Sequence, residues 1–107
     1  MEPQLIEIEV INAARRVMNK REINSITPDY RGFLFNALSL QPMEYVDRGD
    51  LVLLSPVDAE RLAELWGTEV VRTGEFFWRV RVPEELMAIE NAYWESGFEI
   101  EAETEAA

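Results

Sequence analysis

EYVDRGDLVL at residues 44–53 and EVVRTGEFFW at residues 69–78 align without a gap, and these two stretches decide the predicted fold. In each stretch, apolar residues flank a central glycine, which predicts two strands joined by a turn. Each stretch is followed by a proline, Pro56 or Pro83, that suits the first turn of an amphipathic helix. The pattern predicts two ββα units, which either arose by duplication or resemble each other by chance.

Residues at the ends of these two helices mark where each should begin and stop. Ser55 is a typical N-cap, Gly67 is expected to end the first helix, and Gly97 the second. Two ββα units predict a four-stranded, mainly antiparallel sheet with both helices packed on the same face. The sequence leaves open whether the two units lie side by side or face each other.

Two further helices are expected before the first unit. Residues 3–20 combine strand-like alternation with helical spacing, and the acidic start and basic end of the segment favour a helix. The alternative is a short strand before a helix that starts near Glu9. Thr27 and Pro28 predict the start of the second helix, which should run to about Leu40. The predicted fold class is α+β.

The chain is strongly acidic and long enough for one domain. Its 107 residues are 48% hydrophobic and carry a formal charge of −11. Five of the excess negative charges fall from Glu95 onward. We therefore predict one domain at residues 1–98 and an acidic, flexible tail at residues 99–107. The charge argues against direct binding to nucleic acid or to an anionic membrane, and favours a basic partner.

The residue types that are missing also limit the chemistry. The chain has no histidine and no cysteine, which removes histidine relays, thiol nucleophiles, disulfides and the usual zinc sites. We predict no catalytic residues, no cofactor and no metal site. A hydrolase that depends on carboxylates is the least favoured hypothesis, since its acidic residues would have to converge in one pocket. The N-terminus lacks the features of a secretory signal, so a cytoplasmic location is expected.

The stretch from Glu75 to Val82 is the best candidate for a partner-binding strand. Its alternation predicts one core face with Phe76, Trp78, Val80 and Val82, and a second face with an aromatic residue and arginines. On that second face we expect cross-strand Arg–Glu pairs or a protein-binding hot spot. A single-stranded nucleic acid platform would use the same residue types, but the net charge argues against it. The candidate residues on this face are Phe77, Arg79 and Arg81, joined by Arg72 across the hairpin.

Carboxylates on the two predicted helices complete the set of candidates. Glu60 and Glu64 lie one turn apart on the first helix, and Glu84 and Glu85 open the second. Carboxylates at the start of a helix favour its dipole, and an exposed pair usually faces solvent. We nevertheless consider these four residues as contacts for a basic partner.

The function expected from these features is a small, non-enzymatic protein-binding module. One form would be an inhibitor that occupies the basic, nucleic-acid-binding surface of its partner. Phage anti-defence proteins and the immunity proteins of nuclease toxins have this general character, and the likeness is one of composition only. The alternative is a structural or assembly subunit, such as part of a virion or a homo-oligomer.

Overall fold

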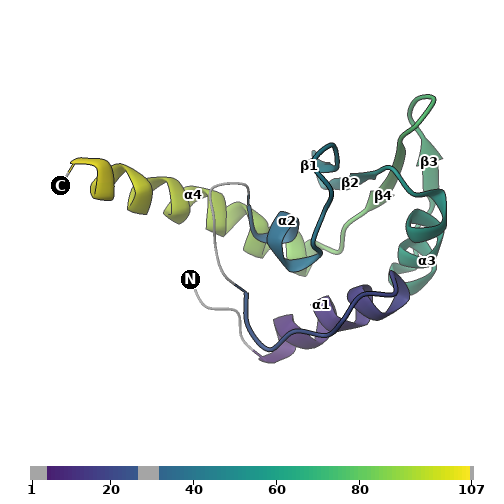
Figure 1. Ribbon diagram of the computed structural model, residues 1–107, viewed down its shortest axis with the longest axis horizontal. Coiled ribbons are helices and arrows are strands. Elements are labelled where there is room, and N and C mark those ends of the chain that lie inside the picture. Colours follow the sequence, from purple (N-terminus) through teal and green to yellow (C-terminus); the bar gives the residue numbers. More distant parts are fainter. Residues whose placement is uncertain (1–4, 27–31, 107) are drawn as a thin grey trace.

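The computed structural model describes the backbone of residues 5–26 and 32–106, and the side chains of residues 7–26 and 32–95. Over the described residues the chain is an α+β fold with one antiparallel sheet, as predicted (Figure 1). The elements in chain order are α1 (Leu5–Val17), α2 (Phe33–Ala37), β1 (Tyr45–Asp47), β2 (Asp50–Leu53), α3 (Pro56–Trp66), β3 (Val70–Arg72), β4 (Trp78–Arg81) and α4 (Glu84–Ala106).

The two hairpins lie side by side in one open sheet. Its strand order is β1-β2-β4-β3, and each neighbouring pair is antiparallel. The hairpins join through β2 and β4, where Asp50 is paired with Arg81 and Leu53 with Trp78. The short strands β1 and β3 form the two edges of the sheet.

The two hairpins have turns of different length, so the gapless alignment does not match β2 with β4. Arg48 and Gly49 form a two-residue turn with φ angles of 52° and 86°, as expected of a tight hairpin. In the second hairpin, residues 73–77 separate β3 from β4. The longer loop delays β4, which begins at Trp78 instead of the expected Glu75.

Helix α3 has the boundaries that its sequence predicts. The hydroxyl of Ser55 accepts a hydrogen bond from the backbone N–H of Asp58 at 3.2 Å, and Pro56 occupies the first turn. Gly67 closes the helix in the left-handed region at φ 68°. All of these signals come from residues close to the ends of the helix in the chain, which explains why the sequence predicted the bounds of α3 correctly.

The other helices depart from their predicted boundaries. The helix predicted within residues 3–20 is confirmed by α1, so the alternative strand is wrong. Helix α2 begins only after Gly32 and ends at Ala37, short of Leu40, and the predicted cap at Thr27 and Pro28 lies outside the described residues. Helix α4 continues past Gly97 to Ala106, so that glycine does not end it. The predicted flexibility of residues 99–107 stays a prediction.

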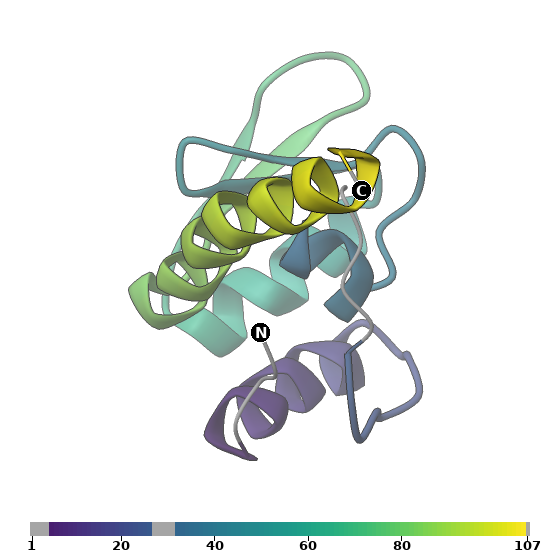
Figure 2. The ribbon, with the colours of Figure 1, turned by 90° about the vertical axis from the view of Figure 1, so that its left-hand side faces the viewer.

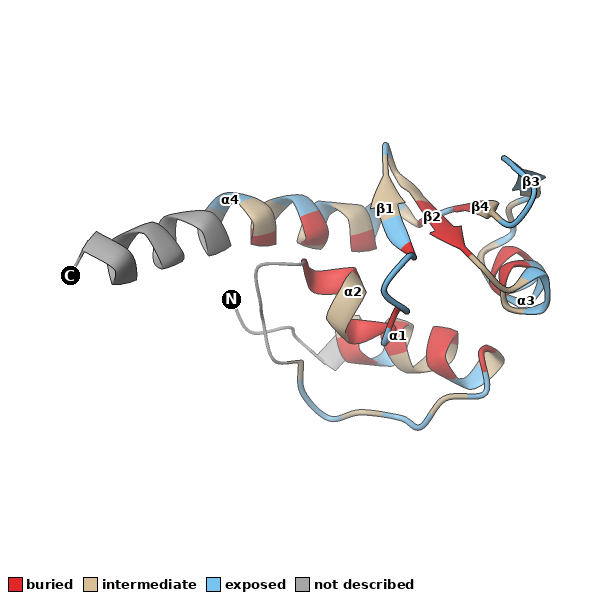
Figure 3. Cartoon of the chain, turned by 45° about the horizontal axis from the view of Figure 1, so that its top comes forward, coloured by how far each residue is buried: buried red, intermediate tan, exposed pale blue. Residues whose placement is uncertain are grey.

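The core lies on one side of the sheet. Helix α3 packs against β2, β3 and β4, and α1 packs against α3 (Figure 2). Buried residues gather on β2 and on the inward sides of the helices, whereas β3 is largely exposed (Figure 3). The expected packing of both unit helices on one sheet face is not confirmed, because α4 packs chiefly against α2.

Candidate functional site

A buried carboxylate on α4 holds the start of α2. Glu90 is 3% exposed, and its Oε1 atom accepts a hydrogen bond from the backbone N–H of Leu34 at 2.7 Å. The backbone N–H of Phe33 and the indole N–H of Trp94 also donate to this carboxylate. Burial raises the pKa of Glu90, and the hydrogen bonds partly oppose that rise. Glu90 therefore caps α2 from a distant part of the chain.

Arg15 in the last turn of α1 and Lys20, three residues beyond that helix, hold the other end of α2. The Arg15 guanidinium is buried and donates to the carbonyl of Ala37 at 2.7 Å. The Lys20 ammonium donates to the carbonyls of Leu38 and Ser39, and burial lowers its pKa. These contacts satisfy carbonyls that the helix end leaves unpaired. The buried charges of Glu90 and Arg15 and the half-buried charge of Lys20 are thus explained by the fold.

The sheet face opposite α3 is the first candidate surface, and we call it the open face. Its central row runs across all four strands, because Tyr45 is paired with Val52, Val52 with Arg79, and Arg79 with Val71. Val52 is 1% exposed but lies outside the main core cluster, whereas Tyr45 and Val71 are 49% and 56% exposed. The open face comprises Tyr45, Asp47, Asp50, Val52, Val71, Arg79 and Arg81.

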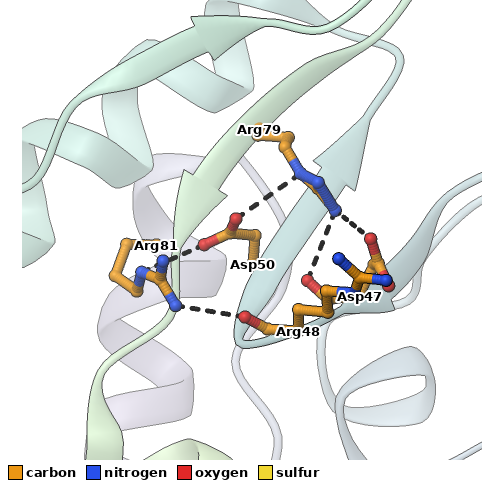
Figure 4. Close-up of polar contacts among 5 residues, drawn as sticks. All are labelled: Asp47, Arg48, Asp50, Arg79 and Arg81. Atoms are coloured by element: carbon orange, nitrogen blue, oxygen red, sulfur yellow. Dashed lines mark hydrogen bonds and ion pairs between the residues drawn. The ribbon is translucent and has the colours of Figure 1, made fainter.

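Two arginines and two aspartates form a network on the open face (Figure 4). The Arg79 guanidinium pairs with Asp47 and lies 3.4 Å from the Asp50 carboxylate. The other oxygen of Asp50 lies 3.1 Å from Nε of Arg81, which also donates to the Arg48 carbonyl. Cross-strand Arg–Asp pairs occupy this face, and over the described residues the Arg–Glu pairs that the sequence predicts are not among its ion pairs. Compensated arginines make a poor surface for nucleic acid phosphates.

Arg72 does not join the open face, so that expectation is wrong. It lies directly opposite Trp78, and directly paired residues share one face of a sheet. Its guanidinium lies 5.9 Å from the centroid of the Trp78 ring and donates to the carbonyls of Gly74 and Glu75. Phe77 precedes β4 in the loop and is half-buried beside Gly74.

The four candidate carboxylates are exposed, and two of them line different hollows. Glu64 lines a hollow of about 680 Å³ together with Arg16 and Arg61. Glu84 lines another hollow, and Glu85 does not. Both hollows are lined by arginines as well as by carboxylates, which differs from the continuous run of negative charge on a nucleic acid.

The hollow that includes Glu84 lies between the turn of the first hairpin and α4, and we call it the hairpin–α4 hollow. Its volume is about 670 Å³. Its apolar lining consists of Val46, Val82, Met87 and Trp94, and its polar lining of Arg48, Arg81, Glu84, Glu90 and Asn91. These residues come from two distant stretches of the chain, 46–49 and 81–94, so no local pattern in the sequence indicates the hollow.

Neither a metal site nor a membrane-spanning helix is found among the described residues, and no known family matches. Among the residues that the structure describes, no group of three or more acidic, histidine or cysteine side chains is placed to hold a metal ion. Within the same part of the chain, no helix has the length and apolar character needed to cross a membrane. Comparisons with protein-family models, curated proteins and solved structures gave no match.

Proposed function

We propose that the chain is a non-enzymatic protein-binding module whose open face binds a partner with a basic surface. The observation that carries this proposal is that α3 covers only one face of the sheet. The other face exposes Tyr45 and Val71 at the two ends of the row that contains Arg79. Tyrosine and arginine are enriched among the residues that dominate binding energy. Because Asp47 and Asp50 already hold Arg79, its side chain loses little freedom when a partner binds.

The net charge supports a basic partner. A formal charge of −11 attracts a basic surface over long range and speeds association. The exposed carboxylates Glu60, Glu64, Glu84 and Glu85 contribute to this attraction. Since arginines are interspersed with them, the charge favours steering of a partner over imitation of a phosphate backbone. An inhibitor that covers a nucleic-acid-binding surface in the cytoplasm is one function of this kind.

The test compares two valines of similar exposure. Val71 on the open face is 56% exposed, and Val57 on α3 is 51% exposed. We expect wild type and Val57→Arg to retain the same basic protein from a lysate of the encoding organism, and Val71→Arg to lose it. With both proteins purified, Val71→Arg should weaken affinity about tenfold or more in calorimetry. Equal affinity for the two variants, or no basic partner at low salt, would contradict the proposal.

A second candidate function is self-assembly through the same face. The aspartates lie on β1 and β2 and the arginines on β4, so two copies related by a twofold axis would place opposite charges together. Light scattering in about 50 mM and about 500 mM salt distinguishes the two functions. A stable multiple of 12.4 kDa that resists salt favours assembly, and a monomer favours binding to another protein.

A further inference from the structure

We infer that the hairpin–α4 hollow receives one cationic side chain, an arginine or a lysine, from the basic partner. The inference rests on the proposed function only for the source of that cation. The hollow has apolar and polar lining in similar measure and includes an exposed carboxylate, Glu84, and its volume of about 670 Å³ exceeds that of a single side chain. It lies beside the first hairpin, whose aspartates belong to the open face, so one partner can reach both.

The apolar wall suits the stem of a long basic side chain. Arginine and lysine carry three or four methylene groups that pack on apolar surfaces while the charged end stays polar. Val46, Val82 and Met87 provide such a surface. Trp94 adds an aromatic ring, which is a favourable neighbour for a cation. Its indole N–H donates to Glu90, so the ring is fixed in position before any ligand arrives.

Within the hollow, Glu84 is the exposed carboxylate that can attract a cation. Arg48 and Arg81 both line the hollow, and the charge of Arg81 is compensated by Asp50 at 3.1 Å. Figure 4 shows the Arg48 side chain extending toward Asp47, away from the Arg81 guanidinium. Among the described residues Glu84 has no ion pair, so its charge is available to a ligand.

The hollow distinguishes two neighbouring carboxylates that the sequence treats alike. Glu84 and Glu85 both lie exposed in the first turn of α4. Each has the same charge and a similar relation to the helix dipole. Only Glu84 lines the hollow, so the pair provides a matched test of contact against general charge.

The first experiment uses the full chain labelled with ¹⁵N and blocked amino acids as probes. The indole N–H signals of Trp66, Trp78 and Trp94 are followed by NMR while N-acetyl-arginine amide or N-acetyl-lysine amide is added. We expect the Trp94 signal to shift and the other two to stay. The matching glutamate and leucine amides should shift Trp94 several-fold less. An equal response to leucine, or no response to either cationic probe, would overturn the inference.

The second experiment repeats the arginine titration with Glu84→Gln and Glu85→Gln. Loss of one partially exposed ion pair predicts an affinity about threefold lower for Glu84→Gln and unchanged for Glu85→Gln. Equal losses would show a general charge effect and overturn the inference. The inference and the proposed function can fail independently. Val71→Arg is expected to remove partner binding and to leave the arginine titration unchanged.

Discussion

Glu90 connects two helices that are far apart in the chain, and its ionisation is therefore coupled to folding. The carboxylate is almost fully buried on α4 and accepts hydrogen bonds at the start of α2. The fit is tight, because a Cβ atom added to Gly32 would lie 2.6 Å from its Oε2 atom. The φ of 106° at Gly32 also favours glycine. Neither residue was singled out from the sequence, since their contact joins distant segments.

The pH dependence of stability should report this buried carboxylate. Burial raises the pKa of folded Glu90 above its ordinary value of 4.5, so the folded state binds more protons than the unfolded state in that window. Its contribution to the free energy of unfolding is present at low pH and falls as pH rises through the window. The stability of wild type relative to Glu90→Gln should therefore fall as the pH rises above about 4.5, by about 1.4 kcal/mol per unit of pKa rise.

Urea unfolding of both proteins at each pH provides the measurement. Glu95→Gln, at an exposed position on the same helix, is the matched control for the loss of one carboxylate. A relative stability that rises with pH, or one that follows Glu95→Gln, would show that the burial of Glu90 does not govern this dependence.

At the scale of elements, the sequence correctly predicted the features that depend on neighbouring residues. The caps of α3 and the turn at Arg48 and Gly49 depend on neighbouring residues, and both were correctly predicted. Helix α2 was predicted too long, because Glu90 and Arg15 hold its ends from other helices. The second hairpin was misaligned because the alternation within a strand does not reveal how many residues lie in the loop before it.

Gly49 is the position where the first hairpin should be most sensitive to substitution. An added Cβ would lie 2.6 Å from the Arg81 guanidinium, and the φ of 86° disfavours any side chain. Gly67 has a similar φ of 68° but no atom within 4 Å of the added Cβ. We expect Gly67→Ala to cost about 1 kcal/mol of unfolding free energy, and Gly49→Ala to cost about 1 kcal/mol more. Urea unfolding measures both, and equal costs would show that Arg81 moves away freely.

At the scale of the whole molecule, the sequence predicted part of the candidate site. It placed Arg79 and Arg81 on one face because alternation along a single strand is enough for that. Asp47 and Tyr45 obey the same alternation on β1 and were detectable by it, yet their place beside Arg79 depends on how the hairpins pair. The hairpin–α4 hollow depends on the packing of α4, and the packing on the sheet that the sequence predicts for this helix is not confirmed.

Added salt has two opposing effects on the stability of this acidic chain. Added salt weakens ion pairs such as Arg16–Glu22, at 2.6 Å, and those of Asp50. It also screens the repulsion among the excess carboxylates of a chain with charge −11. Exposed ion pairs contribute about 0–1 kcal/mol each, so the repulsion should dominate. We expect the Tm to rise by a few degrees between about 20 mM and about 500 mM NaCl.

Thermal unfolding followed by circular dichroism tests this balance. The control is the double variant Glu60→Gln and Glu64→Gln, which removes two exposed negative charges from α3 without disturbing the sheet network. Its Tm should be higher than that of wild type in low salt and should rise less with added NaCl. A wild-type Tm that falls with salt would mean that the ion pairs outweigh the repulsion. The −11 charge would then act mainly on encounters with a partner, with little effect on the fold itself.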